Sequence, residues 1–160
     1  MNTLFHKRRA DLARWMSTNG VQAVVFEDAE GKRSPAVRYY TNHPEDAILV
    51  INNKAESVLC PWDEHIAKQK AVIDTIVPYT KYDRTAIKAV GALLKMLKVP
   101  EKSRVEIPST TPYPVFLRYV DAFPQYDILC KEEHTHHFAV EQRQVKDDYE
   151  IECARKAADI

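Results

Sequence analysis

Short apolar runs rich in β-branched residues alternate along this chain with segments of helical periodicity, and this alternation limits the folds open to it. Six runs have the length and composition of buried strands: residues 21–26, 46–51, 57–62, 75–79, 104–108 and 126–132. Strands separated by helices need crossover connections, which place helices on both faces of a sheet. The pattern therefore predicts an α/β domain of three layers, with a mixed sheet of about six strands flanked by helices.

Helical segments are predicted over residues 3–18, 34–41, 63–72 and 112–123, and from Asp83 onward. The helix from Asp83 has the clearest apolar stripe, with apolar residues recurring at positions 87, 90, 94 and 97. The runs 46–51 and 57–62 are separated only by a short polar turn, which predicts a hairpin.

Composition narrows the class of protein further. Hydrophobic residues make up 45% of the 160 residues and charged residues 29%, which is typical of one globular domain. Lysine plus arginine equals aspartate plus glutamate at 23 each, so there is no electrostatic footprint for nucleic acid. The basic stretch His6–Arg9 is interpreted as a solvated helix face. No apolar run is long enough for a signal peptide or a membrane helix, and three widely spaced cysteines suit a reducing cytoplasm.

The sequence contains no recognisable catalytic motif. With three glycines it has no glycine-rich phosphate loop, and it has no nucleophile elbow, no C-x-x-C and no H-E-x-x-H. Cys60 and Cys130 are interpreted as small core residues, and a cysteine–histidine nucleophile pair stays open without local support.

Three polar clusters are candidate sites. Asp63-Glu64-His65 is interpreted as the acidic start of a helix. His134-x-His136-His137 is either a surface loop or an adventitious metal site, since residues two apart share one face of an extended segment. The stretch Tyr39–Pro44 combines aromatic, amide and imidazole groups in a predicted loop, where either recognition or simple packing would explain them.

The last segment begins as a well-formed helix. Asp147 can serve as the N-cap with Glu150 three residues later, as in a capping box, and residues 151, 154 and 158 fall on one apolar face. No glycine, asparagine or proline stop signal follows before Ile160.

The order of elements resembles the N-terminal domain of the creatinase/prolidase family, the Xaa-Pro aminopeptidases and dipeptidases. Three pieces carry the resemblance: Arg9–Met16 followed by Gly20–Val25, then Ser34–Thr41, then Val140–Ile151. They are similar to the family's "R-x-x-L-x-x-x-M … G-V-D-A", "S-P-x-N-I-R-Y-L-T-G" and "L-R-x-x-K-S-x-x-E-I". Asn42 departs from the pattern, because the family usually has glycine there.

The resemblance implies a ribonuclease H-like architecture in residues 1–146, with 147–160 as the first helix of a catalytic domain not contained in this chain. It implies two divalent metals (manganese, cobalt or zinc) held by that catalytic domain, with no catalytic residue, metal ligand or cofactor in this chain. It further implies a lid that shapes substrate access, and partners that are the catalytic domain, a second copy of the protein and short proline-containing peptides, without nucleic acid or membrane.

On that basis, Tyr40, Asn42 and His43 are the residues expected to face the substrate cleft. The alternative is a non-catalytic peptide- or protein-binding module of the same fold, as in the FACT histone chaperone.

Overall fold

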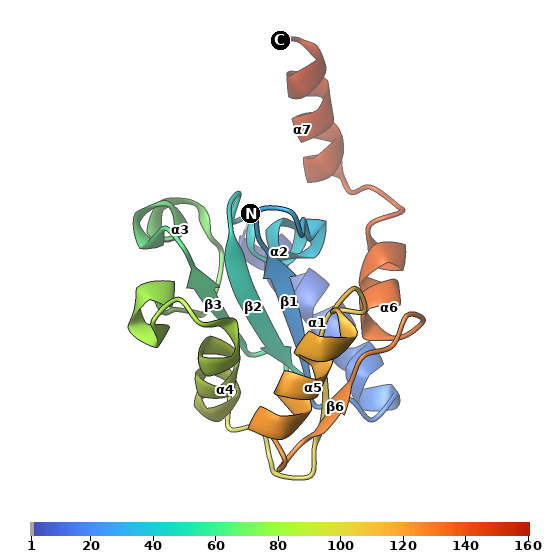
Figure 1. The fold of residues 1–160 in the computed structure, drawn as a ribbon. Helices are drawn as coiled ribbons and strands as arrows, with labels where there is room; N and C mark the ends of the chain where they lie inside the picture. The colour runs from blue at the N-terminus through green and yellow to red at the C-terminus, as the bar shows by residue number, and fades with distance from the viewer. Residues whose placement is uncertain (1) are drawn as a thin grey trace.

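The computed structural model describes residues 2–160 and shows a six-stranded mixed sheet with helices on both faces (Figure 1). The strands are β1 (Ala23–Asp28), β2 (Ala47–Asn52), β3 (Ser57–Pro61), β4 (Thr75–Ile76), β5 (Arg104–Glu106) and β6 (Asp127–Leu129). The helices are α1 (Asn2–Thr18), α2 (Pro35–Thr41), α3 (Glu64–Lys70), α4 (Ala86–Met96), α5 (Tyr113–Ala122), α6 (Thr135–Gln142) and α7 (Asp148–Ala158), with a 3-10 helix, η1, at Tyr79–Tyr82.

The sheet has the strand order β4-β3-β2-β1-β5-β6. Its centre is antiparallel, with Val25 opposite Val50 and Leu49 opposite Leu59, so the predicted β2–β3 hairpin is confirmed. The remaining neighbours, β1–β5, β5–β6 and β3–β4, are parallel. The predicted fold class, a mixed α/β sheet of six strands, is confirmed.

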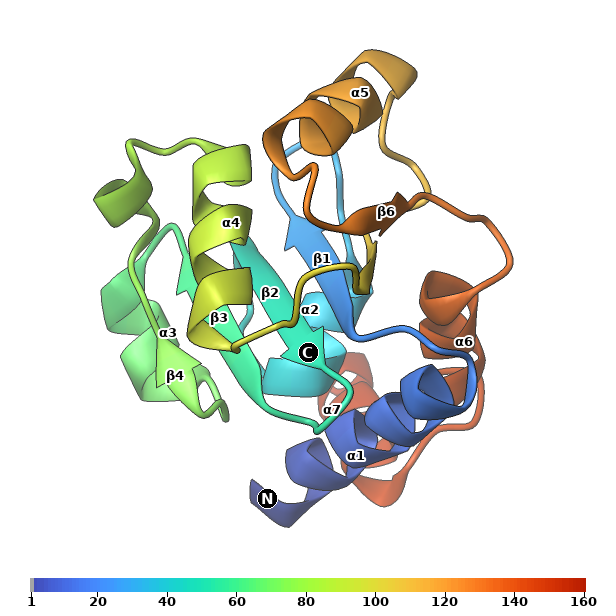
Figure 2. The same ribbon diagram turned by 90° about the horizontal axis from the view of Figure 1, so that it is seen from below.

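Two apolar layers hold the helices to the sheet, and the pleat of the strands separates them. Along β1, Val25 packs with α4 and α5 on one face, whereas Val24 and Phe26 pack with α1 and α2 on the other. Figures 1 and 2 show this arrangement, with α4 and α5 on the opposite side of the sheet from α1, α2 and α6. The core is therefore split by the sheet into two halves, as a three-layer domain requires.

Three local predictions were wrong. Helix α4 begins at Ala86 and not at Asp83, because Asp83 and Arg84 have φ angles of 52° and 51° and so cannot open a right-handed helix. The strand predicted over 75–79 is only two residues long and is followed by Pro78, which leads into η1. The histidine cluster His134–His137, for which a surface loop was one interpretation, lies at the start of helix α6.

Helix α7 extends away from the rest of the domain (Figure 1). The predicted capping box is confirmed, since Asp147 accepts from the Glu150 backbone and the Glu150 side chain accepts from the Asp147 backbone. None of the residues of α7 is buried, so the helix is attached mainly through its first turn.

Candidate functional site

Two consecutive arginines of α1 are buried, which corrects the interpretation of His6–Arg9 as a solvated face. Arg9 is fully buried and donates to the backbone oxygens of Tyr40 at 2.7 Å and Val72 at 2.8 Å. Only His6 and Lys7 of this stretch face solvent. The sequence spacing could have indicated this burial. Positions 5, 8, 9 and 12 share one helix face, and Phe5 and Leu12 at its two ends are apolar.

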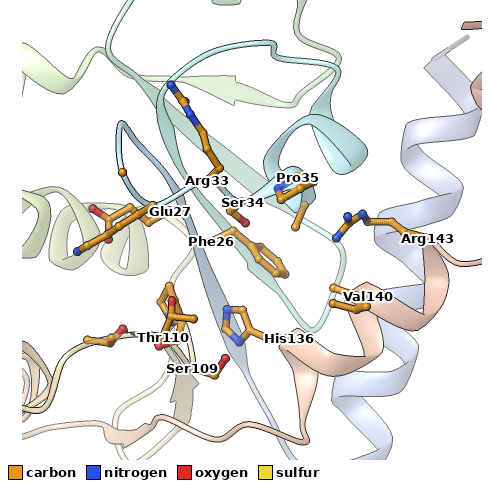
Figure 3. Close-up of a pocket in the computed structure, with 16 residues that line it drawn as sticks. Phe26, Glu27, Arg33, Ser34, Pro35, Ser109, Thr110, His136, Val140 and Arg143 are labelled. Atoms are coloured by element: carbon orange, nitrogen blue, oxygen red, sulfur yellow. Dashed lines mark hydrogen bonds between the residues drawn. The ribbon is translucent and has the colours of Figure 1, made fainter. Parts of the chain in front are cut away.

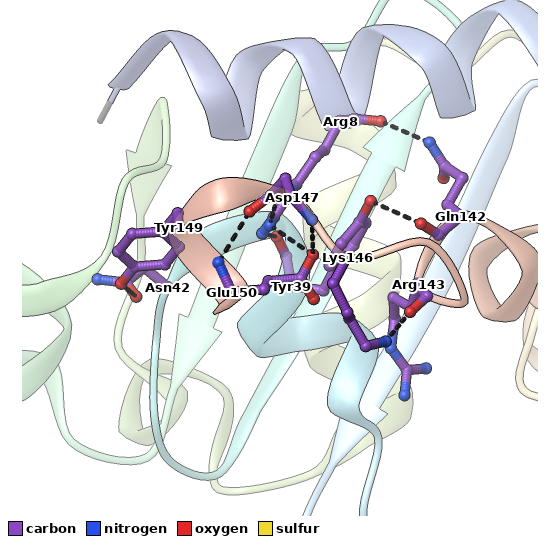
Figure 4. Close-up of polar contacts among 9 residues, drawn as sticks. All are labelled: Arg8, Tyr39, Asn42, Gln142, Arg143, Lys146, Asp147, Tyr149 and Glu150. Carbon is purple, nitrogen blue, oxygen red and sulfur yellow. Dashed lines mark hydrogen bonds and ion pairs between the residues drawn. The ribbon is translucent and has the colours of Figure 1, made fainter. Parts of the chain in front are cut away.

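Arg8 joins α1 to α2 and to the start of α7 (Figure 4). Its guanidinium donates to the Tyr39 backbone oxygen at 2.7 Å, stacks 4.0 Å from the Tyr39 ring centroid, and pairs with the carboxylates of Asp147 and, at 3.2 Å, Glu150. Partial burial would raise the pKa of Asp147, but hydrogen bonds from the Glu150 backbone and from Arg8 outweigh it and lower that pKa. The first turn of α7 is therefore held by charge on the body of the domain.

A groove of about 690 Å³ lies between α2 and α7. Its walls are mostly apolar and include Phe5, Tyr39 and the predicted apolar face of α7, formed by Ile151, Ala154 and Ala158. The groove is edged by four cations, Arg38, Arg143, Lys146 and Arg155. None of these four forms an ion pair within the described residues.

The three residues predicted to face a cleft lie at different depths. Asn42 lines the groove, where it ends α2 with a φ of 61° and accepts a hydrogen bond from the Tyr149 hydroxyl at 3.0 Å. This left-handed conformation explains why the family pattern has glycine here and why asparagine, the next most tolerant residue, replaces it.

Tyr40 and His43 are fully buried and do not line the groove. The Tyr40 hydroxyl donates to the Gln142 side-chain oxygen at 2.5 Å, and burial raises its pKa. Neither ring nitrogen of His43 has a hydrogen-bond partner within the described residues, and burial lowers its pKa. The structure thus places Asn42 at the groove and the other two beneath it; the assignment of all three to a substrate cleft stays a prediction.

A buried carboxylate was missed by sequence reasoning. Glu106, at the end of β5, is fully buried and accepts hydrogen bonds from the His134 Nδ1 at 2.5 Å, the Thr135 hydroxyl at 2.7 Å and the His136 Nδ1 at 3.0 Å. Burial alone would raise the pKa of Glu106, but these hydrogen bonds outweigh it and lower the pKa to about 2. The cluster attaches the start of α6 to the sheet.

The cluster also corrects the interpretation of His134–His137 as a surface loop. The rings of His134 and His136 are turned inward onto Glu106, and only His137 lies outside, 3.4 Å from Glu141. Both ring nitrogens of His136 face oxygen atoms, since Nδ1 lies 3.0 Å from the Glu106 carboxylate and Nε2 lies 2.9 Å from the Val25 backbone oxygen. Across residues 2–160, no cluster of three or more histidine, cysteine, aspartate or glutamate side chains is placed to hold a metal ion.

Two smaller predictions are confirmed. Asp63 caps α3 by accepting from the backbone N–H groups of His65 and Ile66, as an acidic helix start requires. Cys60 is buried in the core, and burial raises the pKa of its thiol to about 12, which removes it as a nucleophile at neutral pH.

A second pocket, of about 500 Å³, lies at the carboxyl ends of β1 and β5 (Figure 3). Phe26 of β1 and the loop 108–111 after β5 form one part of it. Ser34 and Pro35 before α2 and Val140 and Arg143 at the end of α6 form the other part.

The arrangement of elements matches solved structures of proline-specific peptidases. A creatinase/prolidase-like N-terminal domain from Corynebacterium diphtheriae superimposes with a TM-score of 0.55 at 16% identity, over 78% of this chain and 94% of that one. The chain has the fold of a creatinase/prolidase N-terminal domain. An Xaa-Pro aminopeptidase structure from Streptococcus pyogenes agrees, with a TM-score of 0.62 at 18% identity over 86% of this chain and 98% of that one.

A prolidase from Thermococcus sibiricus matches 97% of this chain with a TM-score of 0.65 at 17% identity, and this chain spans 41% of its length. No protein-family model and no curated protein matches the sequence. Among the helices described by the structure, none is both long and apolar enough to cross a membrane.

Proposed function

We propose that this chain is the N-terminal lid and dimerisation domain of a cytoplasmic, metal-dependent Xaa-Pro dipeptidase or aminopeptidase. The observation that carries the proposal is the creatinase/prolidase N-terminal fold, which the chain shares with these peptidases over 78% to 97% of its residues. The described residues offer no cluster that fits a metal ion, so the two divalent metals would be held by a separate catalytic domain.

Helix α7 supports a domain boundary near residue 147. Its head is fixed by Arg8 through Asp147 and Glu150, yet no residue of the helix is buried. Most amphipathic helices in proteins are stabilised by tertiary packing of their apolar face, and the apolar face of α7 remains exposed within the described residues. We propose that residues 1–146 form the lid domain and that the exposed face of 147–160 packs within the catalytic domain.

The substrate-facing part of the lid is proposed to be the end of α2. Asn42 contributes an amide at the groove, and the tyrosine ring of Tyr39 beside it offers an apolar surface to a short peptide. Tyr40 and His43 support this turn from below. Proline-containing peptides, the catalytic domain and a second copy of the chain are the proposed partners.

The test is hydrolysis of the dipeptide Ala-Pro in the presence of manganese or cobalt. Residues 1–160 alone should show no turnover. The product of the coding sequence read on beyond Ile160 should cleave the peptide and should lose activity with a chelator. Turnover by the 160 residues, or a longer product that binds peptides without cleaving them, would contradict the proposal; the second result would favour the non-catalytic binding module.

A further inference from the structure

The pocket at the carboxyl ends of β1 and β5 lies at a switch point of the sheet. The strands β1 and β5 are parallel neighbours, and the chain leaves them toward opposite edges of the sheet. It runs from β1 through α2 to β2, and from β5 through α5 to β6. Helices α2 and α5 also lie on opposite faces of the sheet. In open α/β sheets, a crevice outside the strand ends at such a point is the usual place for a ligand.

The lining offers hydrogen-bond donors without internal partners. Ser34 caps α2 through its backbone only, and within the described residues its hydroxyl and that of Ser109 make no hydrogen bond. Arg143 is half-buried and its guanidinium forms neither an ion pair nor a hydrogen bond within the described residues. In Figure 3 this guanidinium is directed toward Pro35, beside Ser34 and Val140.

Two cations that line the pocket, Lys32 and Arg143, form no ion pair within the described residues, and of these only Arg143 is half-buried. Arg33 is engaged by Asp46 and, at 3.5 Å, by Asp28. Both ring nitrogens of His136 are already engaged, so this side chain forms part of the floor but has no N–H left to donate. Glu27 lies on the opposite side of the pocket from Arg143 (Figure 3).

The rest of the lining is largely apolar, apart from Lys32, Thr110 and Thr111. The buried Phe26 lies at the centre, with Pro35 and Val140 near it in Figure 3, and Pro108 also lines the pocket. A volume of about 500 Å³ falls within the range of small-molecule sites, which combine such apolar walls with a few placed polar groups.

We propose that this pocket binds a small organic acid, whose carboxylate is held by Arg143 and the Ser34 hydroxyl and whose apolar body packs against Pro35 and Val140, above the buried Phe26. A guanidinium suits a carboxylate because its N–H groups match the two oxygens in a planar, bidentate pair. This pocket shares Pro35 and Arg143 with the groove at α7, but Ser34, Ser109 and Phe26 line this pocket and not the groove. The proposal does not depend on peptidase activity.

The test uses the 160-residue chain labelled with ¹⁵N and titrated with benzoate, with neutral benzamide as the matched probe. Benzoate should shift the amide signals of Phe26, Ser34 and Ser109 saturably, with a dissociation constant of about 1 to 10 mM for so small a ligand. Benzamide should bind at least tenfold more weakly, because it lacks the charge. Inorganic phosphate should not compete with benzoate, because it has no apolar body.

Variants separate the proposed site from general attraction to a basic surface. Arg143→Gln should weaken benzoate at least tenfold, and Ser34→Ala should weaken it by a few-fold. Arg38→Gln removes an equally unpaired cation from the neighbouring groove and should leave benzoate binding unchanged. Melting curves of each variant confirm that it is folded.

Several results would overturn the proposal. These are an absence of shifts at ten times the expected dissociation constant, equal binding of benzamide, full competition by phosphate, and equal losses in Arg143→Gln and Arg38→Gln.

Discussion

Replacing Glu106 with glutamine should lower the free energy of unfolding by about 3 kcal/mol at pH 6. The side chain is fully buried and its oxygens accept from His134, Thr135 and His136. These contacts favour the charged form strongly enough to bring the pKa from 4.5 to about 2 in the folded protein. At about 1.36 kcal/mol per pH unit, this difference corresponds to about 3 kcal/mol. Glutamine keeps the shape but points an N–H₂ group at donors.

The pH dependence has a definite sign. Because the folded pKa lies below the unfolded value, the stabilisation by Glu106 is fully present above about pH 5.5 and is lost as the pH falls toward 2. Other carboxylates with lowered pKa values, such as Asp147, contribute equally to both proteins. The difference in stability between wild type and Glu106→Gln should therefore shrink steadily between pH 5 and pH 2.

Urea unfolding followed by tryptophan fluorescence measures this difference, since Trp15 packs directly on His134 and Phe138. Glu141→Gln is the matched control, because Glu141 also faces a histidine of α6 but is half-exposed. It should change stability by less than about 0.5 kcal/mol. If Glu106→Gln were as stable as the control at pH 6, or kept the wild-type acid dependence, the argument for a buried charged anchor would be wrong.

Three further changes test the attachments of α2, α4 and α7. Asn42→Ala should destabilise the domain by about 1–2 kcal/mol in urea, because alanine is strained at a φ of 61° and the bond from Tyr149 is lost; Asn42→Gly should cost less. Gly91→Ala should lower the melting temperature, since its Cβ would lie 2.8 Å from the Phe123 ring and overpacking costs about 1–3 kcal/mol; a rise would show that the ring moves aside. Arg8→Met should speed amide exchange in the first turn of α7 without changing exchange in α4, and equal exchange in both proteins would refute the role of Arg8.

The sheet could be predicted because its signals are local. Each long strand is a continuous apolar run, and the β2–β3 hairpin has a short polar turn between two such runs. The capping box at Asp147 is likewise contained within four residues. Patterns of this kind do not depend on what lies elsewhere in the chain.

Helix α6 and the Glu106 cluster could not be predicted because their causes are distant in sequence. Phe138 packs on Trp15, and Thr135 bonds to Glu106, 29 residues away. The amino acids of α6 show little amphipathic periodicity, so its helical conformation depends on these tertiary contacts. A histidine-rich polar segment read alone is typical of an exposed link.

The placement of Tyr40 shows a different limit. An aromatic residue in a predicted loop can face a cleft or fill a core, and the sequence does not choose between them. Here α2 extends to Thr41, so Tyr40 lies on its buried side while Asn42, at the end of the helix, faces outward.

Three buried polar side chains hold the last segment of this domain. Glu106 holds the start of α6, Tyr40 holds Gln142 at its end, and Arg8 holds Asp147 at the head of α7. Ion pairs removed from water contribute little net stability compared with apolar packing, but they fix one geometry, because any other arrangement leaves a buried charge unpaired. Apolar contacts are non-directional and would have left the position of the segment on the domain less strictly defined. These three anchors therefore determine the direction in which α7 leaves the body, as the proposed connection to a catalytic domain through that helix would require.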